Sequence, residues 1–189
     1  MDGLDLLIAD HNRFRGIFTR FQEAKDNEDV DEMGELADKL AFELKVHTDL
    51  EEKIFYPAVR KLDEEIAEVV DEGLQEHHVG DVLVEEASTL QPGEDEWVAK
   101  ITVLIESVEH HIDEEEEELF PQVRTKSDAE TRAEWGARME AMKAEQGAPK
   151  PADAEKLSLD ELKQLASEQQ IANRSKMSRE DLAAAVDAR

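Results

Sequence analysis

The chain has 189 residues, enough for one ordinary domain of roughly 100 to 150 residues and a small appendage, but not for two large domains. Its 49 acidic residues outnumber 22 basic ones, and the net charge of −27 argues against DNA wrapping and against binding to anionic membranes. Cysteine is absent, which excludes disulfides and thiolate metal sites, suits a cytoplasmic location and leaves only nitrogen and oxygen atoms as metal ligands.

As far as Lys126, apolar residues recur at three- and four-residue intervals, and glycine and proline are few. This pattern predicts helices at about 4–25, 30–62, 63–90 and 95–124, with a clear turn at the Gln-Pro-Gly of residues 91–93. Short connections favour antiparallel neighbours. We therefore predict an all-α fold in which residues 1–126 form an antiparallel, up-down-up-down four-helix bundle.

The remaining residues predict three further segments: an additional, more polar helix at 127–146, a linker at 147–154, and a small helical module at 155–189. The module should contain two short helices that begin near Ser158 and Ser178, where serine is suited to cap a helix N-terminus. The N-terminus lacks the basic residues of a signal peptide, and no apolar run approaches the roughly 20 residues that span a membrane. These features predict a soluble, cytoplasmic protein with no membrane contact.

The inward stripe of each bundle helix is interrupted by polar residues at positions where leucine or valine is expected. These residues are His11, His47, Glu51, His77, His111 and Glu115. Burying an unpaired carboxylate costs several kcal/mol, so two glutamates in a core require a compensating cation. The four-residue spacing of each His-x-x-x-Glu pair places both side chains on the same helix face. The six residues therefore predict a metal site.

An internal repeat relates the two halves of the bundle. The first-half residues recur in the second half at offsets of 66, 64, 64 and 64 residues: His11, His47, Glu51 and Pro57 correspond to His77, His111, Glu115 and Pro121. One helix pair is used twice, and antiparallel pairing of the halves is expected to bring the four histidines into one layer.

A lone histidine followed by His-x-x-x-Glu, occurring twice, resembles the hemerythrin family, specifically the bacterial hemerythrin-like HHE domains, over roughly residues 1–126. The resemblance implies two iron ions with a bridging oxo or hydroxo group, bridged by Glu51 and Glu115 and capped by the four histidines. It also implies an open position for dioxygen, peroxide or nitric oxide. Oxygen-carrying members have a fifth histidine that this sequence lacks at a matching place, which argues against reversible oxygen transport. Manganese and zinc accept the same ligands, so the choice of iron rests on the resemblance.

Several neighbouring residues are either further ligands or solvated groups. Asp81, one turn after His77, fits a solvated acid somewhat better than a ligand, and His78 and His110 are predicted to flank the site or face solvent. In the acidic run at 113–118 only Glu115 is predicted to point inward, although Glu52, Glu114 and Glu118 are alternative ligands.

Other residues near the repeat are given structural interpretations. Tyr56 is a candidate to hydrogen-bond a ligand. Pro57 and Pro121 are predicted to kink or end their helices. The large aromatic residues are predicted to belong to the core: Phe14, Phe18, Phe21, Phe42 and Phe55.

The resemblance, added to the predicted metal site, implies a non-haem di-iron protein that binds or senses dioxygen, peroxide, nitric oxide or iron itself. One alternative is a di-iron redox enzyme, such as a catalyst of peroxide disproportionation, although the sequence shows no dedicated general base or substrate pocket. The other is an acidic helical adaptor whose tail recruits a partner.

Residues 155–189 resemble the small N-terminal module of the Rho transcription terminator and, more loosely, SAP domains. Arg174, Lys176 and Arg179 cluster at the predicted turn, where a phosphate backbone is one candidate for weak contact. The module has seven acidic and six basic residues and no interleaved aromatic ones, so protein docking or a simple folding appendage are the alternatives.

Overall fold

A computed structural model describes residues 1–147, 159–168, 174 and 182, and within these residues every regular element is helical. This confirms the predicted all-α class. None of the described helices is both long enough and apolar enough to cross a membrane.

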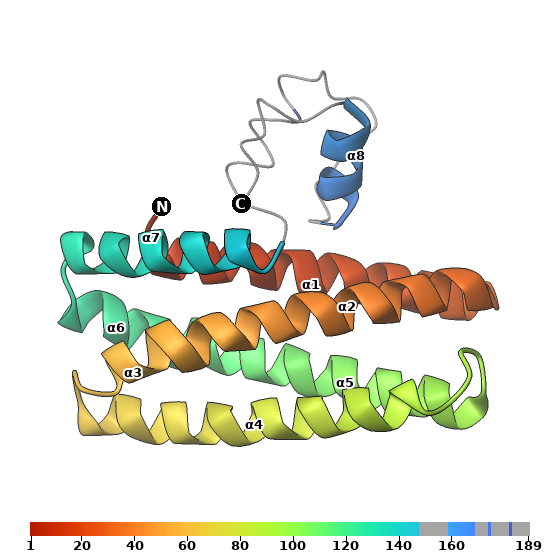
Figure 1. Cartoon of the computed structure of the whole chain (residues 1–189), viewed down its shortest axis with the longest axis horizontal. Helices are drawn as coiled ribbons and strands as arrows, with labels where there is room; N and C mark the ends of the chain where they lie inside the picture. Colours follow the sequence, from red (N-terminus) through yellow and green to blue (C-terminus); the bar gives the residue numbers. More distant parts are fainter. Residues whose placement is uncertain (148–158, 169–173, 175–181, 183–189) are drawn as a thin grey trace.

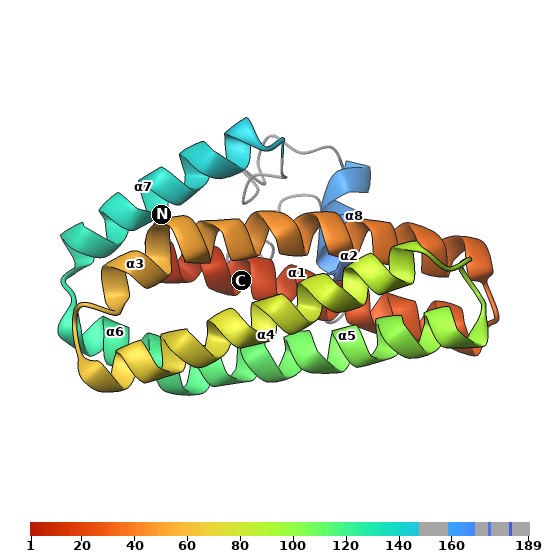
Figure 2. The ribbon, with the colours of Figure 1, turned by 60° about the horizontal axis from the view of Figure 1, so that its bottom comes forward.

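Four long helices form the bundle: α1 (Gly3–Asp26), α2 (Val30–Leu50), α4 (Glu64–Ser88) and α5 (Asp95–Glu114). Successive helices run in opposite directions, as Figures 1 and 2 show. α1 packs against α2 and α4 packs against α5, so each repeat half is one helix pair. The predicted up-down-up-down bundle is therefore confirmed.

An aspartate is the N-cap residue of α1, α2 and α4, and also of a further helix, α7 (Ala129–Glu145). A carboxylate that accepts a backbone N–H at the N-cap satisfies a donor that the helix leaves unpaired, and its negative charge suits the positive end of the helix dipole. The four aspartates and the residues whose N–H groups they accept are Asp2 with Leu4, Asp29 with Glu32, Asp63 with Glu65, and Asp128 with Thr131.

The sequence predicted continuous helices at about 30–62 and 95–124, but the second and fourth helices of the bundle are each interrupted. A single π-helical turn, η1 (Glu51–Phe55), joins α2 to α3 (Tyr56–Val59), and a second, η2 (Glu115–Leu119), joins α5 to α6 (Phe120–Lys126). In each turn a backbone N–H donates to the carbonyl five residues earlier, from Tyr56 to Glu51 and from Phe120 to Glu115.

The repeated prolines explain why these wider turns occur. Pro57 and Pro121 lie in the first turn of α3 and α6, where a missing N–H is tolerated, whereas inside a regular α-helix each would remove a hydrogen bond and clash with the preceding turn. Neither proline ends its helix, because the π turn before it absorbs the misfit and a short helix follows.

The apolar core is divided into two clusters along the bundle. One cluster lies at the end formed by α3, α6 and the start of α1, and includes Leu4, Leu7 and Phe55. The other lies toward the opposite end and includes Phe14 and Trp97. His11 lies between Leu7 and Phe14 on α1, so the predicted polar layer separates the two apolar clusters.

Phe42 does not belong to either cluster, because 49% of its surface is exposed. Its position two residues after Leu40 rotates it by about 200° around the helix axis, away from the buried stripe. The prediction that it is a core residue was wrong. The other four phenylalanines in that group are buried, as predicted: Phe14, Phe18, Phe21 and Phe55.

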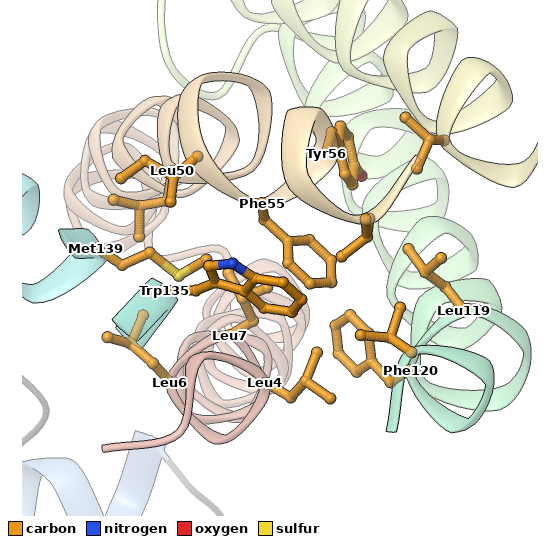
Figure 3. Packing of buried hydrophobic residues seen from close by; sticks show 14 of the residues in the cluster. Leu4, Leu6, Leu7, Leu50, Phe55, Tyr56, Leu119, Phe120, Trp135 and Met139 are labelled. Carbon is orange, nitrogen blue, oxygen red and sulfur yellow. The ribbon is translucent and has the colours of Figure 1, made fainter. Parts of the chain in front are cut away.

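A fifth helix, α7 (Ala129–Glu145), lies along α1 and also contacts α2 and η1. It inserts Trp135 and Met139 into the first apolar cluster, beside Phe55 (Figure 3). Gly136 lets the helix approach the chain start closely, since a Cβ there would lie 2.1 Å from the carbonyl oxygen of Met1. The helix predicted at 127–146 is thus part of the wall of the bundle.

Beyond residue 147 the structure describes α8 (Leu159–Glu168), which contacts α1 and buries Leu162 and Ala166. Most of the predicted linker, and most of the predicted 155–189 module including Ser158, Ser178, Lys176 and Arg179, lie outside the described residues.

Candidate metal centre

The six residues predicted as a metal site meet in the middle of the bundle, and all six side chains are buried. α1, α2, α4 and α5 contribute one histidine each, and the two π turns begin with the two glutamates. The histidines face one another in pairs within one layer. Nε2 of His11 lies 3.2 Å from Nε2 of His47, and Nε2 of His77 lies 3.2 Å from Nε2 of His111.

Each glutamate connects the two repeat halves. The oxygens of Glu51 lie 3.1 Å from Nε2 of His47 and 3.2 Å from Nε2 of His77. Glu115 Oε2 lies 3.3 Å from Nε2 of His11 and 3.8 Å from Nε2 of His111. The two carboxylates therefore lie between the histidine pairs, as bridging ligands would.

Three buried carboxylate oxygens have no hydrogen-bond donor: both oxygens of Glu51 and Oε2 of Glu115. Such atoms carry a large desolvation cost that a cation would remove. Two groups of donor atoms, each within 4.8 Å of one another, surround them: His11, His47, Glu51 and Glu115 in one, and Glu51, His77 and His111 in the other. A nitrogen and oxygen donor set of this kind suits iron, manganese or zinc. The residues thus fit two neighbouring cations that share Glu51.

A second carboxylate orients each imidazole from behind through its Nδ1 atom. The Nδ1 to oxygen distances are 2.9 Å for His11 with Glu116, 3.5 Å for His47 with Asp10, 3.0 Å for His77 with Glu52, and 2.7 Å for His111 with Glu76. An Nδ1–H that donates to a carboxylate leaves the Nε2 lone pair directed toward the centre.

Sequence reasoning missed Asp10, Glu76 and Glu116, and considered Glu52 only as a substitute ligand. The prediction that Glu115 alone points inward from 113–118 was wrong, since Glu116 is half-buried against His11. A signal was present, because the repeat extends to these positions. Asp10 and Glu76 each precede the lone histidine, and Glu52 and Glu116 each follow the inner glutamate.

His47 and Glu51 shift each other's pKa within the centre. Burial alone would lower the pKa of His47, but Glu51 and Asp10 together raise it to about 10. Burial alone would raise the pKa of Glu51, but the neighbouring charges of His47 and His77 hold it well below its ordinary value. A cation that binds here must therefore displace the proton of His47.

Tyr56 breaks the symmetry between the two glutamates. Its hydroxyl donates a hydrogen bond to Glu115 Oε1 at 3.0 Å, whereas the corresponding residue of the second half, Phe120, has no hydroxyl. Burial and the neighbouring charge of Glu115 raise the pKa of Tyr56 well above its ordinary value, so it remains a donor. Gly73 makes room for this contact, because a Cβ there would lie 2.9 Å from the Tyr56 hydroxyl.

The other histidines and acids near the motif lie outside the centre. His78, Asp81 and Glu118 are exposed. His110 is 66% exposed and contacts Glu114 at 3.2 Å, on the outer face of α5. Of the two placements predicted for His78 and His110, flanking the site or facing solvent, both residues take the exposed one.

A cavity of about 180 Å³ opens beside the centre. His47, His77 and His111 form part of its wall, Asp81 lines it as well, and most of the remaining lining is apolar, including Phe14 and Val84. The centre therefore has an apolar approach on the side of the His77 and His111 pair.

Comparison with known proteins places this geometry in a family. The model for the hemerythrin HHE cation binding domain matches residues 2–123. A protein of Nostoc sp. described as a DNA nickase is 26% identical over 142 residues, which cover 74% of this chain and 38% of the nickase. An uncharacterized hemerythrin-like protein of Schizosaccharomyces pombe is 26% identical over 118 residues, which cover 62% of this chain and 57% of that protein.

The chain thus spans less than two thirds of the length of either relative, and no solved structure matches it significantly. The matched segment contains all four bundle helices and the six inner residues. The predicted resemblance is confirmed over that segment, which makes up most of the chain. The chain belongs to the hemerythrin family of HHE cation-binding domains.

Proposed function

We propose that this chain holds two iron ions and binds or senses a small ligand such as dioxygen, peroxide or nitric oxide. His11 and His47 would hold one ion, His77 and His111 the other, and Glu51 and Glu115 would lie between them. The observation that carries the proposal is the group of three buried carboxylate oxygens with no hydrogen-bond donor, surrounded by four imidazole nitrogens.

The donor set and the cavity support a ligand-binding role. Two histidines and a carboxylate for each ion, with positions left open, are typical of non-haem iron sites that react with oxygen. Bound iron would supply an open coordination position and one-electron redox chemistry. The apolar cavity beside His77 and His111 would admit a small uncharged molecule and exclude most water.

The remaining roles belong to the side chains of the protein. Four carboxylates, here called the outer carboxylates, contact the imidazoles through Nδ1 and keep them oriented: Asp10, Glu52, Glu76 and Glu116. The Tyr56 hydroxyl holds Glu115 in place by its hydrogen bond. Because the pKa of His47 is raised to about 10, this residue would release its proton as the ions bind.

Elemental analysis and an optical spectrum of the aerobically purified protein test this proposal. We expect about two irons per chain and ligand-to-metal charge-transfer bands. Glu51→Gln, which keeps the shape of the residue shared by both groups, should lose most of the iron. Glu117→Gln, which removes an exposed carboxylate from the same acidic run as Glu115, is the matched control and should keep it. Clearly fewer than two irons per chain in the native protein, or full iron in Glu51→Gln, would contradict the proposal.

Two activity measurements separate ligand binding from catalysis. Peroxide turnover by the iron-loaded protein should not exceed that of the same amount of free iron, and turnover above it would favour the redox-enzyme alternative. The Nostoc relative is described as a DNA nickase, but the charge of −27 opposes contact with DNA. We therefore expect no nicking of supercoiled plasmid by the iron-loaded protein.

A further inference from the structure

The outer carboxylates of the two metal positions differ in their cation partners. Asp10 and Glu76 occupy corresponding places in the repeat, and each accepts from a histidine of its own half. Behind Asp10 lies the ammonium group of Lys143, which forms an ion pair with it. Among the described residues, the ion-pair partners of Glu76 are the two histidines His111 and His110.

Lys143 belongs to α7, which is outside the repeated four-helix unit. Only 3% of its surface is exposed, so its charge is poorly screened by water. It reaches the centre through two contacts, from Lys143 to Asp10 and from Asp10 to His47. The fifth helix thus adds a buried positive charge behind one metal position.

The other pair of outer carboxylates shows the same difference. Glu116, which orients His11, is paired with Arg15 at 2.9 Å. Glu52, which orients His77, is 38% exposed, and its ion-pair partner among the described residues is His77 alone. Both outer carboxylates of the His11 and His47 position therefore form an ion pair with a lysine or arginine. Among the described residues those of the His77 and His111 position form none, and Lys45 acts on Glu52 only through a longer-range interaction of charges.

A carboxylate behind an imidazole increases the electron donation of that imidazole to a bound ion. A lysine paired with the carboxylate draws charge away from the imidazole and also repels the ion directly. Because a trivalent ion is repelled more than a divalent one, the divalent state is favoured.

We propose that Lys143 is a positioning residue that acts through Asp10 and His47. It raises the reduction potential of the iron ion at the His11 and His47 position, an inference that rests on the proposed function. The two positions then have different potentials, and the ion at the His11 and His47 position is the harder to oxidise. The helix outside the bundle makes an otherwise repeated site unequal.

A spectroelectrochemical titration of the iron-loaded full chain tests this inference, with an electrode that supplies and removes the electrons. The native protein should show two separate one-electron steps. Lys143→Met, which keeps much of the side-chain volume and removes the charge, should shift the higher potential downward and narrow the gap between the steps. Lys143→Arg, which keeps the charge, should retain most of the gap.

Arg132→Met is the matched control, because Arg132 also belongs to α7 and forms an ion pair at 2.7 Å with Asp2, the N-cap of α1, which lies nine residues before His11. An unchanged higher potential in Lys143→Met, or an equal shift in Arg132→Met, would overturn the inference. If Lys143→Met does not fold, Asp10→Asn decides instead. It retains the lysine charge and removes the carboxylate, so the higher potential must rise, and any other result overturns the inference.

Iron content is measured on the same samples and keeps the two proposals distinguishable. Two irons per chain, together with an unchanged higher potential in Lys143→Met, would contradict the role of Lys143 and leave the proposed function standing. Fewer than two irons in the native protein would remove both.

Discussion

The helix pairs α1–α2 and α4–α5 repeat the same inner residues but have different surroundings. Each pair supplies two histidines, one glutamate, a π turn and a proline at corresponding positions. The first pair is also covered by α7, which brings Trp135 to Phe55 and Lys143 to Asp10. The comparison shows that the repeat specifies the inner residues, while non-repeated neighbours make the two halves chemically unequal.

The largest expected effect tests the packing of α7 on the first pair. Phe55 is fully buried and contacts Trp135, Phe120 and Tyr56 through its ring. Phe55→Ala should lower the free energy of unfolding by about 3–5 kcal/mol, because it leaves a cavity between α7 and the bundle. Phe42→Ala on the same helix pair is the control and should change it little, since Phe42 is half exposed. Denaturant unfolding measures both variants, and an equal loss of unfolding free energy in Phe55→Ala and Phe42→Ala would contradict the packing of α7 on Phe55.

The next effect concerns pH in the chelator-treated protein. The pKa of His47 is raised from 6.5 to about 10, so its stabilising contribution is complete below pH 6.5 and is lost as the pH rises through about 10. The lowered pKa of Glu51 acts in the opposite direction: its contribution is present above pH 4.5 and is lost as the pH falls through the pKa of the folded state. The free energy of unfolding should therefore decline between pH 6.5 and 10.

The metal-loaded protein should respond to pH in the opposite way, because metal ions compete with protons for the histidines. Its apparent metal affinity should increase from pH 5 to 8.

In the metal-free protein, His47→Gln should reduce the decline in the free energy of unfolding between pH 6.5 and 10. A free energy of unfolding that rises with pH in the metal-free native chain would rule out the charged His47 and Glu51 pair.

The smallest effect tests the asymmetry between Tyr56 and Phe120. Tyr56→Phe makes the two halves alike at this position and leaves Glu115 Oε1 without its donor. We expect a loss of about 1–3 kcal/mol in the metal-free protein, because a buried polar atom becomes unsatisfied. The loss should be smaller after metal loading, when a cation would satisfy the carboxylate. Thermal unfolding with and without metal measures this difference, and equal losses in the two states would show that Glu115 does not face the metal.

Much of the centre was predictable because its inner residues obey the helix period. His47 and Glu51 lie one turn apart on the buried stripe of one helix, and the repeat places the same pair on another, so residue spacing alone identified all six positions. Phe42 shows the limit of composition, since its aromatic character predicted burial while its rotation around the axis exposed it. The π turns were missed because a period of 3.6 does not reveal a single wider turn.

Spacing along the chain was thus sufficient for the helical class, the bundle and the inner polar layer, since each follows from which residues share a helix face. The repeat marks the positions of the outer carboxylates, but which histidine each one faces and which cation pairs with it required the tertiary structure. Glu116 contacts His11 across 105 residues and Lys143 contacts Asp10 across 133, and the helix period does not show which of such distant positions meet. Only the packing of α7 and of the continuous segment α5–η2 against α1 brings these charges together, and that packing depends on side-chain shape and burial over the whole bundle.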